Sequence, residues 1–137
     1  MPGYFRAVAP GGAAGSAPRP AARFVADPHS VMLVAEVPSA AGQGAVIGAV
    51  LVRAYDTPTD PTMVPLRRAH VEALVVDRAH RRAGVGTALM ATATAWARER
   101  GAQEVVLTVW AGNKAAEAFY ARLGYRLVSQ ALSKAID

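Results

Sequence analysis

The stretch Val71-Glu72-Ala73-Leu74-Val75-Val76, followed closely by the loop Arg81-Arg82-Ala83-Gly84-Val85-Gly86-Thr87, decides the fold of this chain of 137 residues. The first run is mostly apolar, rich in β-branched residues and short, which predicts a buried strand. Beyond the loop, apolar residues recur at helical spacing up to a cationic turn and Gly101, which predicts a helix. A glycine-bearing loop therefore opens a helix soon after a strand.

Such a loop is suited to bind phosphate. Backbone N–H groups and the positive end of the helix dipole converge at its tip. A Cβ at Gly84 or Gly86 would hold an anion away from these amides. The pattern is no P-loop, because no Gly-Lys-Ser/Thr follows, and it lacks the third glycine and the acidic residue of a dinucleotide site. The alternative interpretation is that the glycines only permit a tight turn.

A second strand–turn–helix pattern follows. Residues 105–110 are apolar and predict another buried strand. The run 114–123 predicts a helix that Asn113 caps and Gly124 ends.

The two patterns together resemble the GCN5-related N-acetyltransferase (GNAT) superfamily. The resemblance rests on R-x-x-G-x-G at residues 81–86 and on V-W-x-x-N-x-x-A-x-x-F-Y-x-x-L-G-Y at residues 109–125, and it covers roughly residues 30–129. It implies one N-acetyltransferase domain over residues 1–137. It also implies a mixed, mostly antiparallel α/β sheet that is splayed between two central parallel strands and carries helices on both faces.

The order of the remaining elements fits this fold class. Further strands are predicted over 31–37, 45–55, 125–129 and 131–136, with a hairpin loop over 38–44 and a proline-rich loop over 56–68. An antiparallel hairpin that leads into two βα units predicts a mixed sheet. The resemblance implies that the two central parallel strands lie at 69–76 and 104–109.

Residues 1–28 are rich in glycine and proline, which predicts an irregular segment. Members of the superfamily begin with a strand and one or two helices that build part of the acceptor pocket. We therefore expect an abbreviated N-terminal region, which means either that the sequence begins late or that the acceptor side is reduced.

Composition narrows the class of protein. The chain has no cysteine, which excludes disulfides, a cysteine nucleophile and thiolate metal sites. Its histidines lack metal-ligand spacing, so no metal is expected. No apolar run approaches the length of a membrane span, which predicts a cytoplasmic protein without membrane contact. The net charge of +5 comes from dispersed arginines, which argues against a nucleic-acid-binding protein.

The resemblance implies that acetyl-CoA is the cosubstrate and lies in the splay of the sheet. Its pyrophosphate would sit on the loop 82–87, and its pantetheine would pair with the backbone of Leu74 and Val76. The candidate coenzyme-binding residues are Leu74, Val75, Val76, Arg81, Arg82, Ala83, Gly84, Val85, Gly86, Thr87, Asn113 and Ala116. Pure helix capping is the alternative role for Asn113, and solvated charge is the alternative for the two arginines.

Acetyl transfer to an amine needs a base for the ammonium, a stabilised oxyanion and an acid for the thiolate. The resemblance implies that Tyr120 is the general acid, with a packed aromatic residue as the alternative. Glu72 is the candidate base because it shares strand parity, and so a sheet face, with Leu74 and Val76. A water chain is the alternative base, and an arginine neighbour is the alternative partner of this carboxylate. A bulge at Val76 would free its N–H for the oxyanion.

The predicted function is acetyl-CoA-dependent transfer of an acetyl group to a primary amine by direct attack in a ternary complex. The acceptor stays open between a small-molecule amine and a peptide N-terminus or lysine. The alternative function is a non-catalytic acyl-CoA-binding or regulatory domain. A homodimer is the default expectation for this fold.

Overall fold

The computed structural model describes residues 4–8, 28–37, 45–57, 62 and 64–136. The chain divides into two compact units, Met1–Leu107 and Thr108–Asp137, and each is described by itself. The predicted hairpin loop over 38–44 and most of the segment 1–28 lie outside the described residues.

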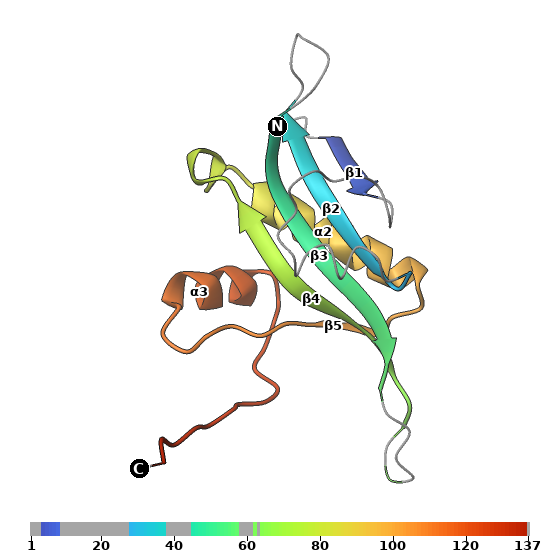
Figure 1. Ribbon diagram of the computed structural model, residues 1–137, viewed down its shortest axis with the longest axis vertical. Coiled ribbons are helices and arrows are strands. Elements are labelled where there is room, and N and C mark those ends of the chain that lie inside the picture. The colour runs from blue at the N-terminus through green and yellow to red at the C-terminus, as the bar shows by residue number, and fades with distance from the viewer. Residues whose placement is uncertain (1–3, 9–27, 38–44, 58–61, 63, 137) are drawn as a thin grey trace. The chain divides into compact units, whose positions relative to one another are not determined.

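The first unit is built on a sheet that has five strands among the described residues (Figure 1). The strands lie side by side in chain order: β1 (Tyr4–Val8), β2 (Ser30–Val37), β3 (Ala45–Asp56), β4 (Arg67–Val76) and β5 (Glu104–Val106). The first four pair antiparallel, whereas β4 and β5 pair parallel. This arrangement confirms the predicted mixed, mostly antiparallel sheet.

The two parallel strands share only a short contact. β5 pairs with β4 over residues 68–70 alone, and β4 continues to Val76 with no second neighbour among the described residues. The sheet is thus open along the carboxyl half of β4, as predicted for the splay. β5 ends at Val106, short of the predicted residue 110, because pairing with β4 stops there.

Helix α2 (Val85–Glu99) packs on one face of the sheet and runs behind the strands in Figure 1. Its apolar residues recur at helical spacing and form one buried face: Val85, Leu89, Met90, Ala93 and Ala97. Leu89 of α2 and Val50 and Val52 of β3 are the largest fully buried side chains. Full burial of such a side chain contributes about 1.5–3 kcal/mol, so this layer anchors the loop that precedes α2.

Two segments predicted to be irregular contain more strand residues than expected. Tyr4–Val8 form the strand β1, because their backbone pairs with β2 in antiparallel register, and the prediction of an irregular stretch there was wrong. The loop between β3 and β4 is also shorter than the predicted 56–68, because β3 includes Asp56 and β4 starts at Arg67. Thr57 N donates to Leu66 O at 2.8 Å and closes this loop.

The second unit has one helix among its described residues, α3 (Lys114–Arg122). Asn113 caps it, since its Oδ1 accepts a hydrogen bond from Ala116 N at 3.2 Å. The strands predicted over 125–129 and 131–136 are absent from this described segment, and those predictions were wrong. Apolar residues alone do not make a strand, because the backbone also needs a partner that supplies its hydrogen bonds.

Candidate functional site

The loop after β4 ends in the N-terminus of α2. A 3-10 turn, η1 (Arg78–His80), leaves the strand, and Gly84 stands at the N-cap of the helix. The first helical hydrogen bond runs from Ala88 N to Gly84 O at 3.0 Å. The N–H groups of residues 85–87 therefore have no acceptor inside the helix. No described side chain caps this end and no acidic residue lies in its first turn, so it is suited to an anion.

The backbone conformation at position 84 favours a glycine. Its φ of 82° is one that residues with a Cβ rarely adopt. A Cβ built on it meets no protein atom within 4 Å, so only the backbone angle and an incoming ligand oppose a side chain there. Gly86 lies inside the first turn of α2. The predicted anion-binding segment thus covers the end of the loop and the start of the helix.

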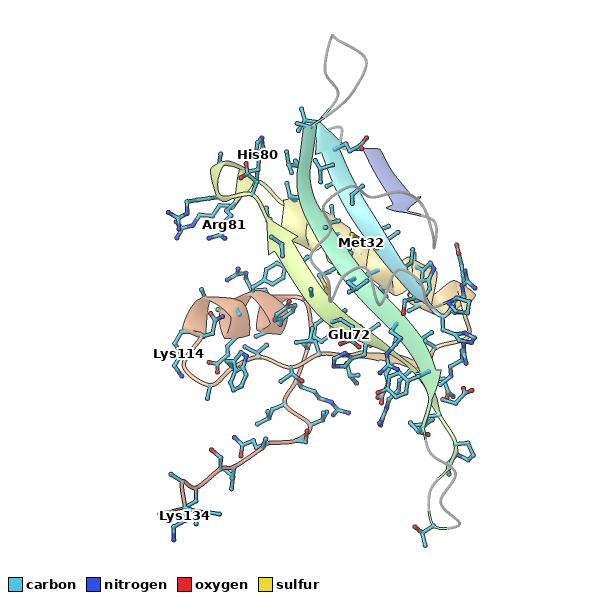
Figure 2. All side chains as sticks on the ribbon, in the orientation of Figure 1. Met32, Glu72, His80, Arg81, Lys114 and Lys134 are labelled. Carbon is cyan, nitrogen blue, oxygen red and sulfur yellow. The ribbon has the colours of Figure 1, made fainter. Side chains whose placement is uncertain are left out.

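The arginines of the loop are exposed, and one of them ties the loop to the strand. Arg81 Nε donates to the carbonyl oxygen of Val76 at 3.2 Å. Figure 2 shows Arg81 and His80 projecting from the loop beyond the end of β4. His80 Nδ1 lies 2.9 Å from Asp77 Oδ2, at the start of η1. Arg81 therefore holds the loop through its Nε, and anion binding by its terminal amino groups stays a prediction.

The backbone of Leu74 and Val76 faces the open edge of β4. Asp77 N donates to Ile47 O of β3 at 2.7 Å. Neighbouring residues of a strand direct their N–H and C=O groups to opposite edges. The backbone groups of Val76 and Leu74 consequently point away from β3, toward the side where β5 pairs no further than residue 70. These are the two residues predicted to pair with a pantetheine chain.

A bulge in β4 changes the sheet face on which the Glu72 side chain lies relative to the residues that follow it. In the register with β3, Val52 pairs with Val71 and Leu51 pairs with Ala73, which leaves Glu72 as an extra residue. The extra residue reverses the alternation of side chains for the part of β4 that follows it.

Because the alternation is reversed, the Glu72 side chain lies on the opposite face of the sheet from those of Leu74 and Val76. Gly48 lies on the face that α2 covers, because its Cβ position is 3.0 Å from a side chain of α2, and Val76 pairs with Gly48. Glu72 instead contacts Arg53, which alternation along β3 puts on the opposite face. The prediction that Glu72 shares a face with Leu74 and Val76 was therefore wrong. The prediction of a bulge at Val76 was wrong as well, because the bulge lies at Glu72.

Glu72 is held by two neighbours on the face away from α2, and Figure 2 shows it on the strand itself, apart from the loop. Its Oε1 accepts a hydrogen bond from Arg53 Nε at 3.3 Å and lies 3.0 Å from His70 Nδ1. Arg53 is thus the arginine partner that was the predicted alternative for this carboxylate. Neither Arg53 nor His70 was among the predicted site residues. The available signal was that His70 precedes Glu72 by two positions in one strand.

Tyr120 lies on α3 in the second unit and is half-buried. Its ring meets those of Phe119 and Tyr125 edge-on, with centroids 5.0 Å and 5.6 Å away. Burial raises the pKa of the Tyr120 phenol above its ordinary value of 10.0, so the hydroxyl keeps its proton at neutral pH. Ala116 N is already engaged by the Asn113 cap, and coenzyme contacts of these two residues stay predictions.

The described part of the chain offers neither a metal site nor a membrane-spanning helix. It holds no group of three or more histidine, cysteine, aspartate or glutamate residues that could bind a metal ion. Within the same residues, no helix is long and apolar enough to cross a membrane. The groups gathered in the first unit are backbone amides, arginines and two histidine–carboxylate pairs, His70–Glu72 and His80–Asp77.

Solved structures with a similar fold include proteins from different sources. A mutant of the BH1408 protein of Bacillus halodurans superposes with a TM-score of 0.76 at 22% identity, over 89% of this chain and 75% of that one. An aminoglycoside acetyltransferase from an uncultured soil metagenomic sample gives 0.72 at 20% identity, with 100% of both chains covered. AAC(6')-Iy in complex with a CoA-containing bisubstrate analog gives 0.70 at 16% identity, over 90% of this chain and 83% of that one. At these identities the likeness shows the fold alone.

Sequence comparison identifies the family. No curated protein matches the chain in sequence. The profile of the acetyltransferase (GNAT) family, however, matches residues 9–125, which include β4, the loop, α2 and α3. Because this match spans most of the sequence, the chain belongs to the acetyltransferase (GNAT) family.

Proposed function

We propose that this protein is an acetyl-CoA-dependent N-acetyltransferase that moves the acetyl group to a primary amine by direct attack in a ternary complex. One observation carries the proposal: the open edge of β4 leads through a short loop into a helix N-terminus whose N–H groups have no acceptor in the helix. An extended pantetheine chain can pair with the backbone of Leu74 and Val76, as a peptide pairs with a sheet edge. The pyrophosphate can then take the amides of residues 85–87.

In the proposed reaction the acceptor ammonium first loses one proton on the Glu72 side of the sheet. Its nitrogen then bonds to the thioester carbonyl carbon, and the carbon–sulfur bond breaks. A backbone N–H on the open edge of β4 would stabilise the oxyanion that develops on the carbonyl oxygen. The Tyr120 hydroxyl would give its proton to the departing thiolate and regain one from the acylated nitrogen.

A small-molecule amine is the acceptor class that we propose. Its support is that three solved structures of similar fold are named as aminoglycoside acetyltransferases. A peptide N-terminus or lysine is the alternative acceptor. A cytoplasmic location and a homodimer stay predictions.

The first test is a calorimetric titration of the purified protein with acetyl-CoA. We expect saturable one-site binding that Gly84→Ala weakens about tenfold or more, because a Cβ would stand in front of the anion-binding amides. Gly101→Ala is the matched control, because Gly101 has a φ of 81° against 82° for Gly84 and lies just past the other end of α2. Both variants carry the same backbone strain, so only Gly84→Ala should lose affinity. Absence of binding by the folded wild-type protein would overturn the proposal.

Release of the CoA thiol separates an enzyme from a binding domain. The assay supplies acetyl-CoA together with a panel of small amines, aminoglycosides and peptides. Thiol release that depends on one acceptor class supports the transferase and identifies the substrate. Tight acetyl-CoA binding with no release across the panel would favour the alternative, a non-catalytic acyl-CoA-binding or regulatory domain.

Tyr120→Phe tests the proposed acid. The variant keeps the ring and removes the proton donor, so kcat should fall about 100-fold or more while acetyl-CoA affinity holds. Phe119→Leu removes a neighbouring ring without touching the hydroxyl and serves as the control for packing. An unchanged kcat in Tyr120→Phe would remove Tyr120 as the acid.

A further inference from the structure

Polar side chains cross the face of the sheet opposite α2. Ser30 of β2 pairs in register with Arg53 of β3, and Arg53 pairs with His70 of β4. Register partners share a sheet face, so these side chains lie in a line across the strands. Glu72 joins them through its contacts with Arg53 and His70. We refer to Ser30, Arg53, His70 and Glu72 as the polar row.

The polar row contains buried atoms that lack hydrogen bonds. Ser30 is 4% exposed, and its Oγ has no hydrogen-bond partner among the residues that the structure describes. His70 Nδ1 is buried and lies 3.0 Å from Glu72 Oε1, but the ring is not aligned for a hydrogen bond to it. Buried polar atoms in native proteins are nearly always hydrogen-bonded. Two such atoms in one row indicate that its side chains rearrange to gain hydrogen bonds.

Glu72 is anchored within this row. Its Oε1 lies 3.3 Å from Arg53 Nε and 3.0 Å from His70 Nδ1, and its side chain is 19% exposed. The two nitrogen groups that share this oxygen fix the orientation of the carboxylate beside the imidazole. A carboxylate beside one ring nitrogen is the arrangement that fixes a histidine tautomer. With its hydrogen on Nδ1 toward Glu72, His70 keeps Nε2 as an acceptor.

We propose that His70 Nε2 takes the proton from the acceptor ammonium, and that Glu72, held by Arg53, positions His70. This inference rests on the proposed function and names the proton acceptor within it. Imidazole as a group suits the role, because its ordinary pKa of about 6.5 is nearer to neutral pH than the value of about 4.3 for a glutamate side chain. A small rotation of the ring aligns Nδ1 with Oε1, and catalytic hydrogen bonds commonly tighten in this way when substrate binds.

The protons balance around this step. The ammonium gives one proton to His70 Nε2, and the neutral nitrogen attacks the thioester carbonyl carbon. The carbon–sulfur bond breaks, the thiolate takes the Tyr120 proton, and the second nitrogen proton restores Tyr120. The imidazolium, stabilised by the Glu72 carboxylate, then releases its proton to water.

The ionisable groups that face His70 come from three strands. They are Arg53 and Tyr55 on β3, Arg68 and Glu72 on β4, and Glu104 on β5. Arg68 is paired with Glu104, and Arg53 lies 5.3 Å from the centroid of the Tyr55 ring while it bonds Glu72. Glu72 is the charged group in contact with the imidazole.

The arrangement is tested first on the wild-type protein, by long-range proton–nitrogen NMR of the histidine rings. We expect His70 to carry its hydrogen on Nδ1 and to change its tautomer balance in Glu72→Ala. His80 is the matched reference, because its Nδ1 lies 2.9 Å from a carboxylate oxygen of Asp77 outside the polar row, and its signal should not respond. A His70 ring with its hydrogen on Nε2 would overturn the inference.

Turnover gives the second arm of the test. We expect His70→Gln to lower kcat about 100-fold or more at unchanged acetyl-CoA affinity, and to remove the acidic limb of the kcat/KM profile. Glu72→Ala should retain that limb, with a smaller loss of kcat. His29→Gln, at an exposed position outside the polar row, is the control.

The outcomes separate the inference from the proposed function. If His70→Gln keeps the acidic limb and Glu72→Ala loses it, Glu72 is the direct base and the inference falls while the transferase stands. A wild-type protein that binds acetyl-CoA but releases no thiol with any acceptor overturns the proposed transfer reaction, and the inference with it.

Discussion

The two halves of β4 build their sites in different ways. In the carboxyl half, from Leu74 into the loop, the groups proposed to face a ligand are backbone amides held in place by α2. In the amino half, from His70 to Glu72, they are side chains whose arrangement depends on strand register and on a bulge. A backbone site tolerates the replacement of most side chains, whereas a side-chain site depends on each of its members.

The halves also differ in what stabilises them. α2 is anchored by apolar side chains such as Leu89, which is fully buried. The polar row is held by partly exposed ion pairs, and the Arg53 side chain is 40% exposed. Buried apolar groups contribute more to stability than exposed ion pairs. We therefore expect substitutions under α2 to change mainly the free energy of unfolding, and substitutions in the polar row to change mainly turnover.

Leu89→Ala should have the largest effect on stability. Leu89 is fully buried, so its truncation leaves a cavity and lowers the free energy of unfolding by about 2–5 kcal/mol. Urea denaturation followed by circular dichroism measures the loss. Arg98→Ala, at an exposed position of the same helix, is the control and should cost about 0.5 kcal/mol or less. A Leu89→Ala loss no larger than the control's would show that α2 is not the anchor.

Gly48→Ala should come next, because it adds volume at the place where Leu89→Ala removes it. A Cβ on Gly48 would lie 3.0 Å from Leu89 Cδ1, 3.1 Å from Val75 O and 3.2 Å from Val85 Cγ1. Overpacking of this kind costs about 1–3 kcal/mol, and pressure on the Val75 carbonyl should also weaken acetyl-CoA binding. In the Leu89→Ala background the same change should cost less, because the cavity accepts the methyl group. Additive losses in this double-mutant cycle would contradict the tight contact between β3 and α2.

The carboxyl half of β4 was predictable because its signals are local in sequence. A short β-branched run predicts the strand, and helical spacing after the glycines predicts α2 close to its observed bounds. Gly84 adopts the positive φ that only a glycine takes easily, which is why the residue type itself marks the turn. Asn113 at the start of α3 was predictable in the same way, since a cap is a local hydrogen bond.

The amino half was not predictable, because its arrangement depends on pairing between segments distant in sequence. Strand parity groups Glu72 with Val76, and one bulge opposite Leu51 and Val52 reverses it. The register that brings Arg53 beside His70 has no local signal either. The last part of the strand predicted over 105–110, and the strands predicted over 125–129 and 131–136, failed for a related reason. Apolar residues form a strand only where a partner pairs with them.

Arg53→Gln should change stability less than either core variant. Its ion pair with Glu72 is partly exposed, and its contact with the Tyr55 ring spans 5.3 Å, so their joint loss should cost about 1 kcal/mol. The same urea curves measure this loss, and kcat is measured beside them. We expect kcat to fall by more than the stability loss suggests, because Glu72 loses the group that holds it. A stability loss equal to that of Gly48→Ala would make the polar row a structural part of the sheet and remove the contrast between the two halves.

The smallest expected effect concerns Tyr120. Burial keeps the proton on its hydroxyl, whereas the side chains of the polar row are held by charged partners. Because burial raises the pKa of this phenol above 10.0, the folded state keeps the proton at a pH where the unfolded state has lost it. The contribution of this group to stability is therefore complete below pH 10.0 and declines as the pH rises through the folded-state pKa. The difference in tyrosinate absorbance between the wild-type protein and Tyr120→Phe should show one phenol that titrates later than a free tyrosine. A midpoint at or below 10.0 would mean that the Tyr120 hydroxyl is as open to solvent as a free phenol, and a thiolate would then compete with water for its proton.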